Sequence, residues 1–185
     1  MRFVVAPLDR YATRLTTGLA YFGGLLTLPL FFAYLANLRW GGLIVPTAFA
    51  LPLALFLLLC YAAQPKAYVI TARELVVERR WLRALRTPLE DVTAGSLATT
   101  LADVPRRGLR FAFNPGIFGY QGPFHLAPYG ATFFLATNRT RLVAVARRDR
   151  VPLILSPDRP RDFVDALNAQ RSNLAVAQLQ TGNAA

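Results

Sequence analysis

Two long runs of apolar residues occupy much of the first third of the chain. They cover residues 15–38 and 40–65, and a short break at residues 37–42 contains a charge and two glycines. A helix of about 24 residues is roughly 36 Å long, which exceeds the hydrocarbon core of a bilayer. The pattern therefore predicts two antiparallel transmembrane helices that form a hairpin over residues 15–65.

Charged residues are consistent with this assignment and predict an orientation. Arg39 is the only charged residue between Leu15 and Gln64. Basic residues flank the two runs on their outer sides: Arg2, Arg10, Arg14, Lys66, Arg73, Arg79 and Arg80. By the positive-inside rule, we expect a multi-pass protein of the bacterial cytoplasmic (inner) membrane with both termini cytoplasmic, including the N-terminal segment 1–14. A cleaved signal peptide is the alternative for the first run, but that run is too long and lacks a small-residue exit before Arg39.

Alternating apolar and polar residues replace the long runs after Pro65. A period of two is typical of β-strands. It predicts strands over residues 67–71, 74–79, 84–88, 92–97, 109–113, 132–136, 142–146 and 151–155. Residues 113–130 are rich in proline, glycine and aromatic residues and are expected to form a surface loop.

The hydrophobic period changes again near the C-terminus. Residues 156–158 are expected to cap a helix that has Pro160 in its first turn and Phe163 and Leu167 on one face. Beyond residue 171 the pattern weakens, so residues 171–185 are expected to form a fraying tail. The order of strands and helix predicts a mostly-β domain over residues 66–170.

This region resembles the bacterial pleckstrin-homology-like (PH-like) domains that follow an N-terminal transmembrane helix pair. The resemblance covers residues 68–167 and rests on these residues: 68–71 with 74–77, 87–92, 114–120, 156–158, Phe163 and Leu167. It implies a partly open antiparallel barrel of about seven strands capped by a C-terminal α-helix. It also implies scaffolding or binding rather than catalysis. Phosphoinositide binding is not implied, because the turn between the first two strands has Arg73 as its only basic residue.

The chain is strongly basic, with 21 Lys and Arg against 10 Asp and Glu and a net charge of +11. Such an excess fits nucleic acid, an acidic protein or anionic lipid headgroups, and attachment to a bilayer favours lipid over the other two. The densest group is a predicted hairpin in which Arg79, Arg80, Arg83 and Arg86 surround Trp81. Its charges either rest on anionic headgroups or prevent pairing at a solvated strand edge. A second basic group comprises Arg106, Arg107 and Arg110.

A glycine-rich aromatic segment, residues 116–124, is the second candidate contact site. Its residues Phe118 and Tyr120 either contact a partner or pack against the chain itself. No catalytic residue, cofactor or metal is expected, because His125 is the only histidine, Cys60 is the only cysteine, and Ser156 is explained as a helix cap.

Together these features predict a non-enzymatic interaction or accessory subunit of a membrane complex. Its expected partners are the lipid bilayer and either another membrane protein or a second copy of the chain. The first alternative is binding or sensing of anionic membrane lipid through the basic hairpin. The second is a transport or enzyme component, which lacks support because the apolar runs contain no acids, bases or polar path.

Overall fold

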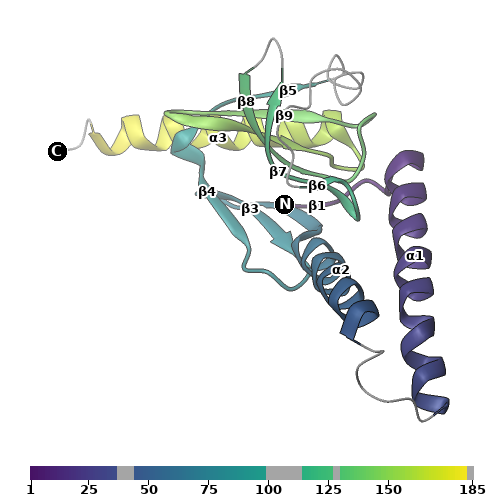
Figure 1. The fold of residues 1–185 in the computed structure, drawn as a ribbon. Coiled ribbons are helices and arrows are strands. Elements are labelled where there is room, and N and C mark those ends of the chain that lie inside the picture. The colour runs from purple at the N-terminus through teal and green to yellow at the C-terminus, as the bar shows by residue number, and fades with distance from the viewer. Residues whose placement is uncertain (37–43, 99–113, 127–129, 183–185) are drawn as a thin grey trace.

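The structure is a computed structural model that describes residues 1–36, 44–98, 114–126 and 130–182. These residues form two β-sheets, a C-terminal helix and a pair of helices that projects from the sheets (Figure 1). We call this pair, α1 (Arg10–Leu35) and α2 (Ile44–Ala63), the helical arm. The two sheets and the C-terminal helix form the β domain.

The first sheet has four antiparallel strands in the order β1-β2-β3-β4. Their bounds are β1 (Arg2–Val4), β2 (Pro65–Ile70), β3 (Glu74–Arg79) and β4 (Leu85–Pro88). β1 pairs with β2 although the whole arm lies between them in the sequence, and Phe3 lies opposite Tyr68. The sequence pattern gave no sign of β1, since three residues are too few to show a period of two.

The second sheet has six strands in the order β5-β9-β10-β8-β7-β6. A short 3-10 helix, η2 (Leu89–Asp91), leads into it from the first sheet. The strand bounds are β5 (Val92–Leu97), β6 (Asn114–Gly116), β7 (Gly119–Leu126), β8 (Gly130–Ala136), β9 (Val143–Arg147) and β10 (Arg150–Leu155). β10 and β8 run parallel, whereas the other pairs are antiparallel.

The prediction of a mostly-β domain with a C-terminal helix is confirmed, but the described strands form two sheets and no closed barrel. Residues 114–126 form β6, a tight turn and β7 instead of a loop. β6 pairs with β7, and β7 pairs with β8 from Tyr120 to Leu126. The strand predicted over residues 109–113 lies outside the described residues.

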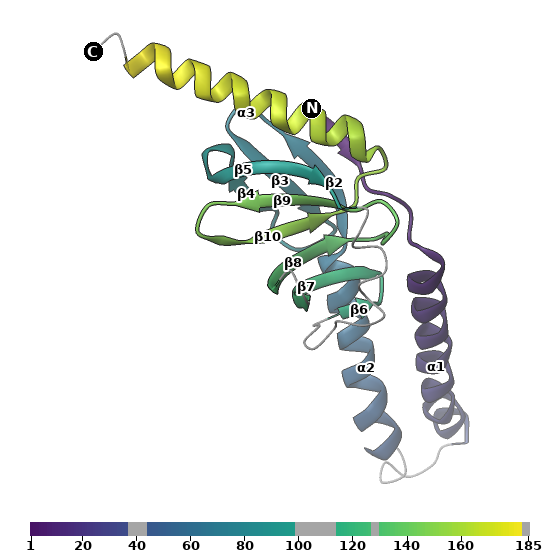
Figure 2. The same ribbon diagram turned by 90° about the horizontal axis from the view of Figure 1, so that it is seen from above.

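The main hydrophobic core lies between the two sheets. Strand alternation supplies it, since Leu153 and Leu155 of β10 face this core while Ile154 faces a second cluster on the other side of the sheet. α3 (Pro160–Gly182) lies across one end of both sheets (Figure 2) and closes the core with fully buried Phe163 and Leu167. The helix therefore begins at Pro160, as predicted, and continues past residue 171, where the sequence pattern weakens.

The helices of the arm are antiparallel neighbours, as predicted. They pack closely at Gly23, where an added Cβ would lie 3.7 Å from Leu53 and 3.8 Å from Leu57. The arm diverges towards the β domain, where α1 follows β1 and α2 leads directly into β2 (Figure 1). It therefore leaves and re-enters the same sheet at adjacent strands.

The prediction that this hairpin crosses a membrane is corrected. Across the described ranges, the structure contains no helix that combines the length and the apolar character needed to span a bilayer. α1 starts at Arg10, before the first apolar run, and has a second arginine, Arg14, in its first turns, while α2 is described from Ile44 to Ala63, within the second run. The transmembrane pair and the multi-pass inner-membrane location with cytoplasmic termini, predicted from these runs, are not supported.

Candidate interaction site at the base of the helical arm

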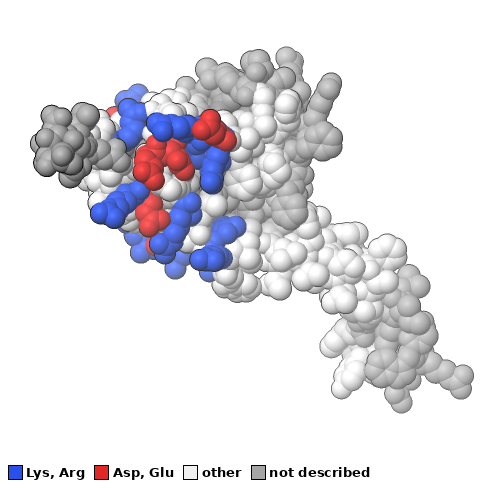
Figure 3. Space-filling view, turned by 90° about the vertical axis from the view of Figure 1, so that its left-hand side faces the viewer, with Lys and Arg blue, Asp and Glu red and all other residues white. Residues whose placement is uncertain are grey.

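The helical arm exposes many large apolar side chains. Those that are at least 45% exposed beyond the first two turns of α1 are Tyr21, Phe22, Leu25, Leu28, Phe31, Phe32, Tyr34 and Leu35, and those of α2 are Phe49, Leu51, Leu55, Leu58 and Leu59. In Figure 3, Lys, Arg, Asp and Glu gather on the β domain, whereas the described part of the arm shows none of them on this face. Exposed apolar surface of this kind makes the arm a candidate interaction site.

Four side chains meet where α2 joins the β domain, and we call them the collar: Tyr61, Arg80, Trp81 and Phe118. The Tyr61 ring lies edge-on to the rings of Trp81 and Phe118, with centroids 5.2 Å away in both cases. The Arg80 guanidinium lies 4.6 Å from the centre of the Tyr61 ring and donates to the Tyr61 hydroxyl at 2.9 Å and to Gln64 at 2.8 Å. Trp81 is 66% exposed. The collar thus presents an aromatic surface beside an ordered cation.

Most arginines of the predicted basic hairpin are engaged by the protein itself. Arg79 donates to the backbone carbonyl of Arg83, and Arg86 pairs with Glu74 at 3.2 Å. Burial lowers the pKa of Arg79 from its ordinary value. Arg80 belongs to the collar, so within the described residues the side chain of Arg83 alone has no partner in this hairpin. The second basic group, residues 106–110, lies outside the described residues.

A tight turn between β6 and β7, which we call the wedge turn (residues 116–119), lies between the bases of the two helices. The Phe118 N–H donates to the Thr16 hydroxyl of α1 at 2.8 Å, while the Phe118 ring contacts Tyr61 of α2. Two glycines of the turn and Phe118 have positive φ. The turn therefore contacts both helices and sets their separation where they leave the β domain.

A buried ion pair fixes α1 to the β domain, and we call it the clamp: Asp9, Tyr120 and Arg139. Asp9 caps α1 by accepting the Ala12 N–H at 2.8 Å. Its carboxylate also accepts the backbone and side-chain N–H groups of Arg139 at 3.2 and 3.0 Å and the Tyr120 hydroxyl at 3.0 Å. The side chains of Asp9 and Arg139 are only 10% and 17% exposed. The clamp is thus a nearly enclosed network at the start of the arm.

The clamp holds its acidic groups in fixed protonation states near neutral pH. Burial by itself would raise the pKa of Asp9, but the N–H groups of Ala12 and Arg139 and the Arg139 guanidinium outweigh it and lower that pKa below 3.8. Burial and the neighbouring Asp9 carboxylate raise the pKa of Tyr120. Asp9 therefore stays ionised and Tyr120 stays a donor, which suits a structural contact better than proton transfer.

Ser156 was expected to cap α3, but it belongs to a different network. Its hydroxyl accepts the Thr137 N–H at 2.7 Å, and its own N–H donates to the Tyr68 hydroxyl at 3.1 Å. Tyr68 in turn donates to the Leu135 carbonyl at 2.7 Å, and burial raises the pKa of Tyr68 to about 12. These contacts connect the two sheets through Ser156. α3 begins four residues after Ser156.

The structure brings three of the seven candidate residues, Arg80, Trp81 and Phe118, into one cluster. Tyr120 belongs to the clamp, whereas Arg79, Arg83 and Arg86 lie elsewhere in the basic hairpin. Sequence reasoning missed Tyr61, Asp9 and Arg139. A signal existed only for Asp9, the single acidic residue before Glu74, whereas Tyr61 looks like any residue at the end of an apolar run.

Metal ligands do not cluster in the part of the chain that the structure describes. No three His, Cys, Asp or Glu side chains there could hold a metal ion. His125 is exposed on β7, and Cys60 is buried in α2, where burial raises the pKa of its thiol to about 11.

Comparison with known protein families, curated proteins and solved structures finds no match. The resemblance to bacterial PH-like domain proteins with a transmembrane helix pair is therefore corrected, since no family model matches and no spanning helix is found among the described residues.

Proposed function

We propose that this chain is a non-enzymatic protein-interaction subunit, in which a protein partner or a second copy of the chain covers the helical arm. The observation that carries the proposal is the exposure of large apolar side chains along both α1 and α2. Burying one such side chain contributes about 1.5–3 kcal/mol. A partner that offers a matching apolar surface is therefore the occupant that this arm favours.

The base of the arm supports the same role. The clamp attaches α1, the collar attaches α2, and the wedge turn contacts both helices. A surface that is held in one geometry before binding loses less conformational entropy when a partner docks. The β domain thus acts as a mount for the arm.

Site-specific photo-crosslinking in living cells tests this proposal. A photoreactive amino acid replaces Leu25 or Phe32 on the arm, and Arg161 on α3 provides the control position, since both kinds of site are exposed. We expect the arm positions to give a discrete cross-linked protein band that the control position does not give. Mass spectrometry then identifies the partner as this chain or as another protein.

Absence of any protein adduct from both arm positions would contradict the proposal. Equal labelling of many abundant proteins from the arm and from Arg161 would contradict it as well, because it would show chance contact. Adducts with lipid alone would support the second candidate function instead.

Binding of an anionic lipid surface is the second candidate, and the exposure of the collar favours it. Trp81 and Leu82 are 66% and 40% exposed at the tip of the hairpin, beside Arg83. An exposed aromatic next to a free arginine suits the boundary between headgroups and acyl chains, and each basic residue near that surface contributes about 1 kcal/mol. The three arginines already engaged by protein groups limit this contribution.

Vesicle sedimentation tests the lipid candidate with the purified chain. Binding should increase with the fraction of anionic lipid, weaken as salt rises, and fall when Trp81 and Arg83 are replaced by Ala and Gln. Binding that ignores lipid charge and salt would exclude this candidate without affecting the first one.

We further propose that the β domain is a variant of the PH-like architecture. An antiparallel sheet, a second sheet and a terminal helix that closes the core between them support this assignment. The parallel pair β8–β10 is the departure from that architecture. An experimental structure whose two sheets fail to share one core beneath α3 would reject it.

A further inference from the structure

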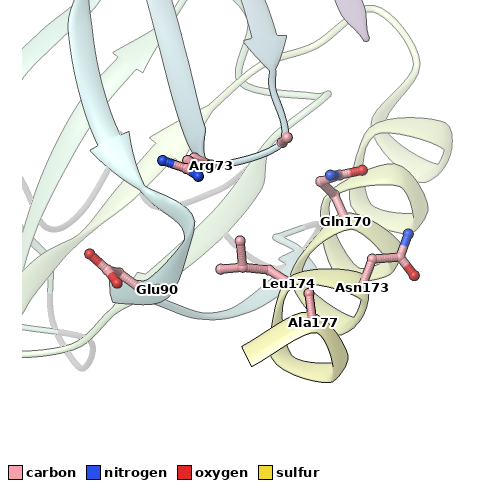
Figure 4. Close-up of a pocket in the computed structure, with 7 residues that line it drawn as sticks. Arg73, Glu90, Gln170, Asn173, Leu174 and Ala177 are labelled. Atoms are coloured by element: carbon pink, nitrogen blue, oxygen red, sulfur yellow. The ribbon is translucent and has the colours of Figure 1, made fainter. Parts of the chain in front are cut away.

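Two surface hollows lie beside α3, one at the β2–β3 turn of the first sheet and the other at the start of β5 and the β9–β10 turn of the second sheet. They share Glu90 and Leu174. The first, of about 550 Å³, is lined by Ala72, Arg73, Glu90, Gln170, Asn173, Leu174 and Ala177 (Figure 4). The second, of about 520 Å³, is lined by Leu89, Glu90, Val92, Thr93, Arg148, Arg171, Ser172, Leu174 and Ala175. Neither hollow includes a residue of the helical arm.

The second hollow contains two guanidinium groups that the protein leaves unpaired. The ion pairs and hydrogen bonds of the described chain include no contact of the Arg148 or Arg171 side chains. This distinguishes them from Arg79, Arg80 and Arg86 of the basic hairpin, which are engaged by protein groups. Two unpaired arginines in one hollow give it a positive potential, which favours a bound anion.

Hydrogen bonds hold both walls of this hollow in place, a backbone one at Arg148 and two of the Asn168 side-chain amide. Arg148 follows β9, and its N–H donates to the Asp91 carbonyl at 2.7 Å. Asn168, one turn before Arg171, accepts the Gly95 N–H and donates to the Gly95 carbonyl, both at 3.1 Å. These contacts fix α3 and the β9–β10 turn to β5 and η2, so the two arginines start from anchored positions.

Close packing of α3 on β5 depends on the absence of a side chain at Gly95. An added Cβ there would lie 2.9 Å from Leu167, which is fully buried. The close approach brings the next turn of α3, which carries Arg171, towards β5. It therefore fixes the distance across the hollow.

We propose that this hollow binds the phosphate group of a small phosphorylated molecule through Arg148 and Arg171. Guanidinium groups match phosphate oxygens with paired, charge-assisted hydrogen bonds. Thr93 also lines this hollow, whereas the Ser172 hydroxyl already donates to the Asn168 carbonyl at 3.0 Å. A single phosphate fills only part of about 520 Å³, so the remaining space accommodates an organic group.

The negative charge of Glu90 should lower the affinity of the second hollow for an anion. Substitutions of Glu90 and of the two arginines should therefore change that affinity in opposite directions. Glu90 lines both hollows, and its carboxylate has no ion-pair partner among the described residues. With one Glu against two Arg, the side chains of the second hollow carry a net charge of +1. Removing the Glu90 charge should therefore strengthen anion binding, while removing either arginine should weaken it.

Calorimetric titration of the purified full-length chain tests the proposal at constant ionic strength. The probes are inorganic phosphate and glycerol phosphate. We expect saturable binding that weakens at least tenfold in Arg148→Gln and in Arg171→Gln and strengthens in Glu90→Gln. Arg161→Gln, an exposed position ten residues before Arg171 on α3, should bind like the parent. Unchanged circular dichroism and melting temperatures show that the variants are folded.

The two probes separate the possible sources of the phosphate group. Tighter binding of glycerol phosphate supports a phosphomonoester, and equal binding supports a site for the free oxyanion. Lack of saturable binding of either probe overturns the proposal, and so does binding that Arg148→Gln and Arg171→Gln leave unchanged. These results are independent of the arm, so failure here would not affect the proposed interaction function.

Discussion

At the scale of single residues, burial decides which charged contacts matter. The Asp9–Arg139 pair is 10% and 17% exposed, whereas the Arg141–Asp158 pair is 44% and 47% exposed. Exposed ion pairs contribute about 0–1 kcal/mol because water and salt screen them, but breaking an enclosed pair leaves an uncompensated charge. The two pairs therefore form a natural comparison within one chain.

Replacing Asp9 by Ala should destabilise the β domain by about 3 kcal/mol, since it removes a helix cap and strands the Arg139 charge. Asp158→Ala is the matched control and should cost less than about 1 kcal/mol. Chemical denaturation of both variants measures the two free energies of unfolding. Equal losses would show that the clamp is no stronger than a surface pair.

Stability should also depend on the charge of Asp9. Because the pKa of Asp9 is lowered in the folded protein, its ionised form adds stability at pH values above the unfolded pKa of about 3.8, and this contribution is lost as the pH falls through the folded pKa. Asp9→Asn removes this contribution. The difference in unfolding free energy between the parent and Asp9→Asn should therefore shrink between pH 6 and about pH 3. A constant difference would mean that charge is irrelevant to the clamp.

Backbone geometry makes another residue-scale prediction at the wedge turn. Gly119 has a φ of 116°, and an added Cβ would lie 2.7 Å from the Ala136 carbonyl oxygen. Gly119→Ala should therefore cost about 3 kcal/mol or more. Gly18 in α1 has no atom within 4 Å of an added Cβ, so Gly18→Ala should be neutral or stabilising by up to about 1 kcal/mol. Thermal melting that ranks the two variants the other way would reject this account.

For single residues, the sequence predicted which side chains of the last helix are buried, but it did not predict side-chain contacts between distant segments. It correctly singled out Phe163 and Leu167 as core residues of the last helix, because a helical period within a short segment identifies its buried face. The sequence analysis assigned Ser156 to a helix cap and overlooked Tyr61, because the contacts that both residues make in the structure are with residues distant in the sequence. Ser156 contacts Thr137 and Tyr68, and Tyr61 contacts Trp81 and Phe118.

At the scale of elements, α3 is the part that unites the two sheets. The Phe163 ring lies 5.2 Å from the ring of Phe3 in β1 and 5.9 Å from that of Tyr68 in β2. Leu167 contributes to the same core, and Asn168 bonds Gly95 of the second sheet. The helix therefore contacts both sheets within residues 163–168, fewer than two turns.

Replacing Phe163 by Ala should cost about 3–5 kcal/mol, because a fully buried ring leaves a cavity beneath α3. Val176, 53% exposed on the same helix, offers the control, and Val176→Ala should change stability by less than about 0.5 kcal/mol. Urea unfolding of both variants decides the matter. A small loss for Phe163→Ala would show that α3 is not part of the core.

Strand prediction succeeded for strands that their own residues indicate, and it failed for strands that are recognised only by their pairing with a neighbouring strand. Residues 74–79 and 92–97 form β3 and β5 with the predicted bounds, and burial alternates along most of β3. β1 has three residues, and β7 contains two glycines and a proline, so neither shows a period of its own. Their hydrogen bonds to β2 and β8 make them strands.

At the scale of the whole molecule, two surfaces of different character belong to one chain. The arm is apolar and the β domain carries the charge (Figure 3). Composition along the chain predicted this division. The expectation of a membrane crossing is not supported, because the described residues contain no helix that is both long enough and apolar enough to span a bilayer.

Polar substitutions on the arm should leave the β domain intact. Leu25 and Phe32 are 61% and 62% exposed, and neither belongs to the two hydrophobic clusters of the β domain. The double variant with Gln at both positions should keep the melting temperature of the parent within about 3 °C, since exposed positions contribute little. Light scattering should show less self-association than in the parent. A large fall in melting temperature would mean that the arm supports the fold.

The pairing of β1 with β2 makes the arm an insertion between two adjacent strands of one sheet. Its two ends are therefore joined to neighbouring rows of hydrogen bonds, with the clamp beside one end and the collar beside the other. A force applied at the far end of α1 and α2 would be transmitted to the edge of that sheet, because only a short connection separates each helix from its strand. A partner that pulls on the arm would thus strain the β domain at β1, so mechanical coupling between the arm and the β domain is expected at this strand.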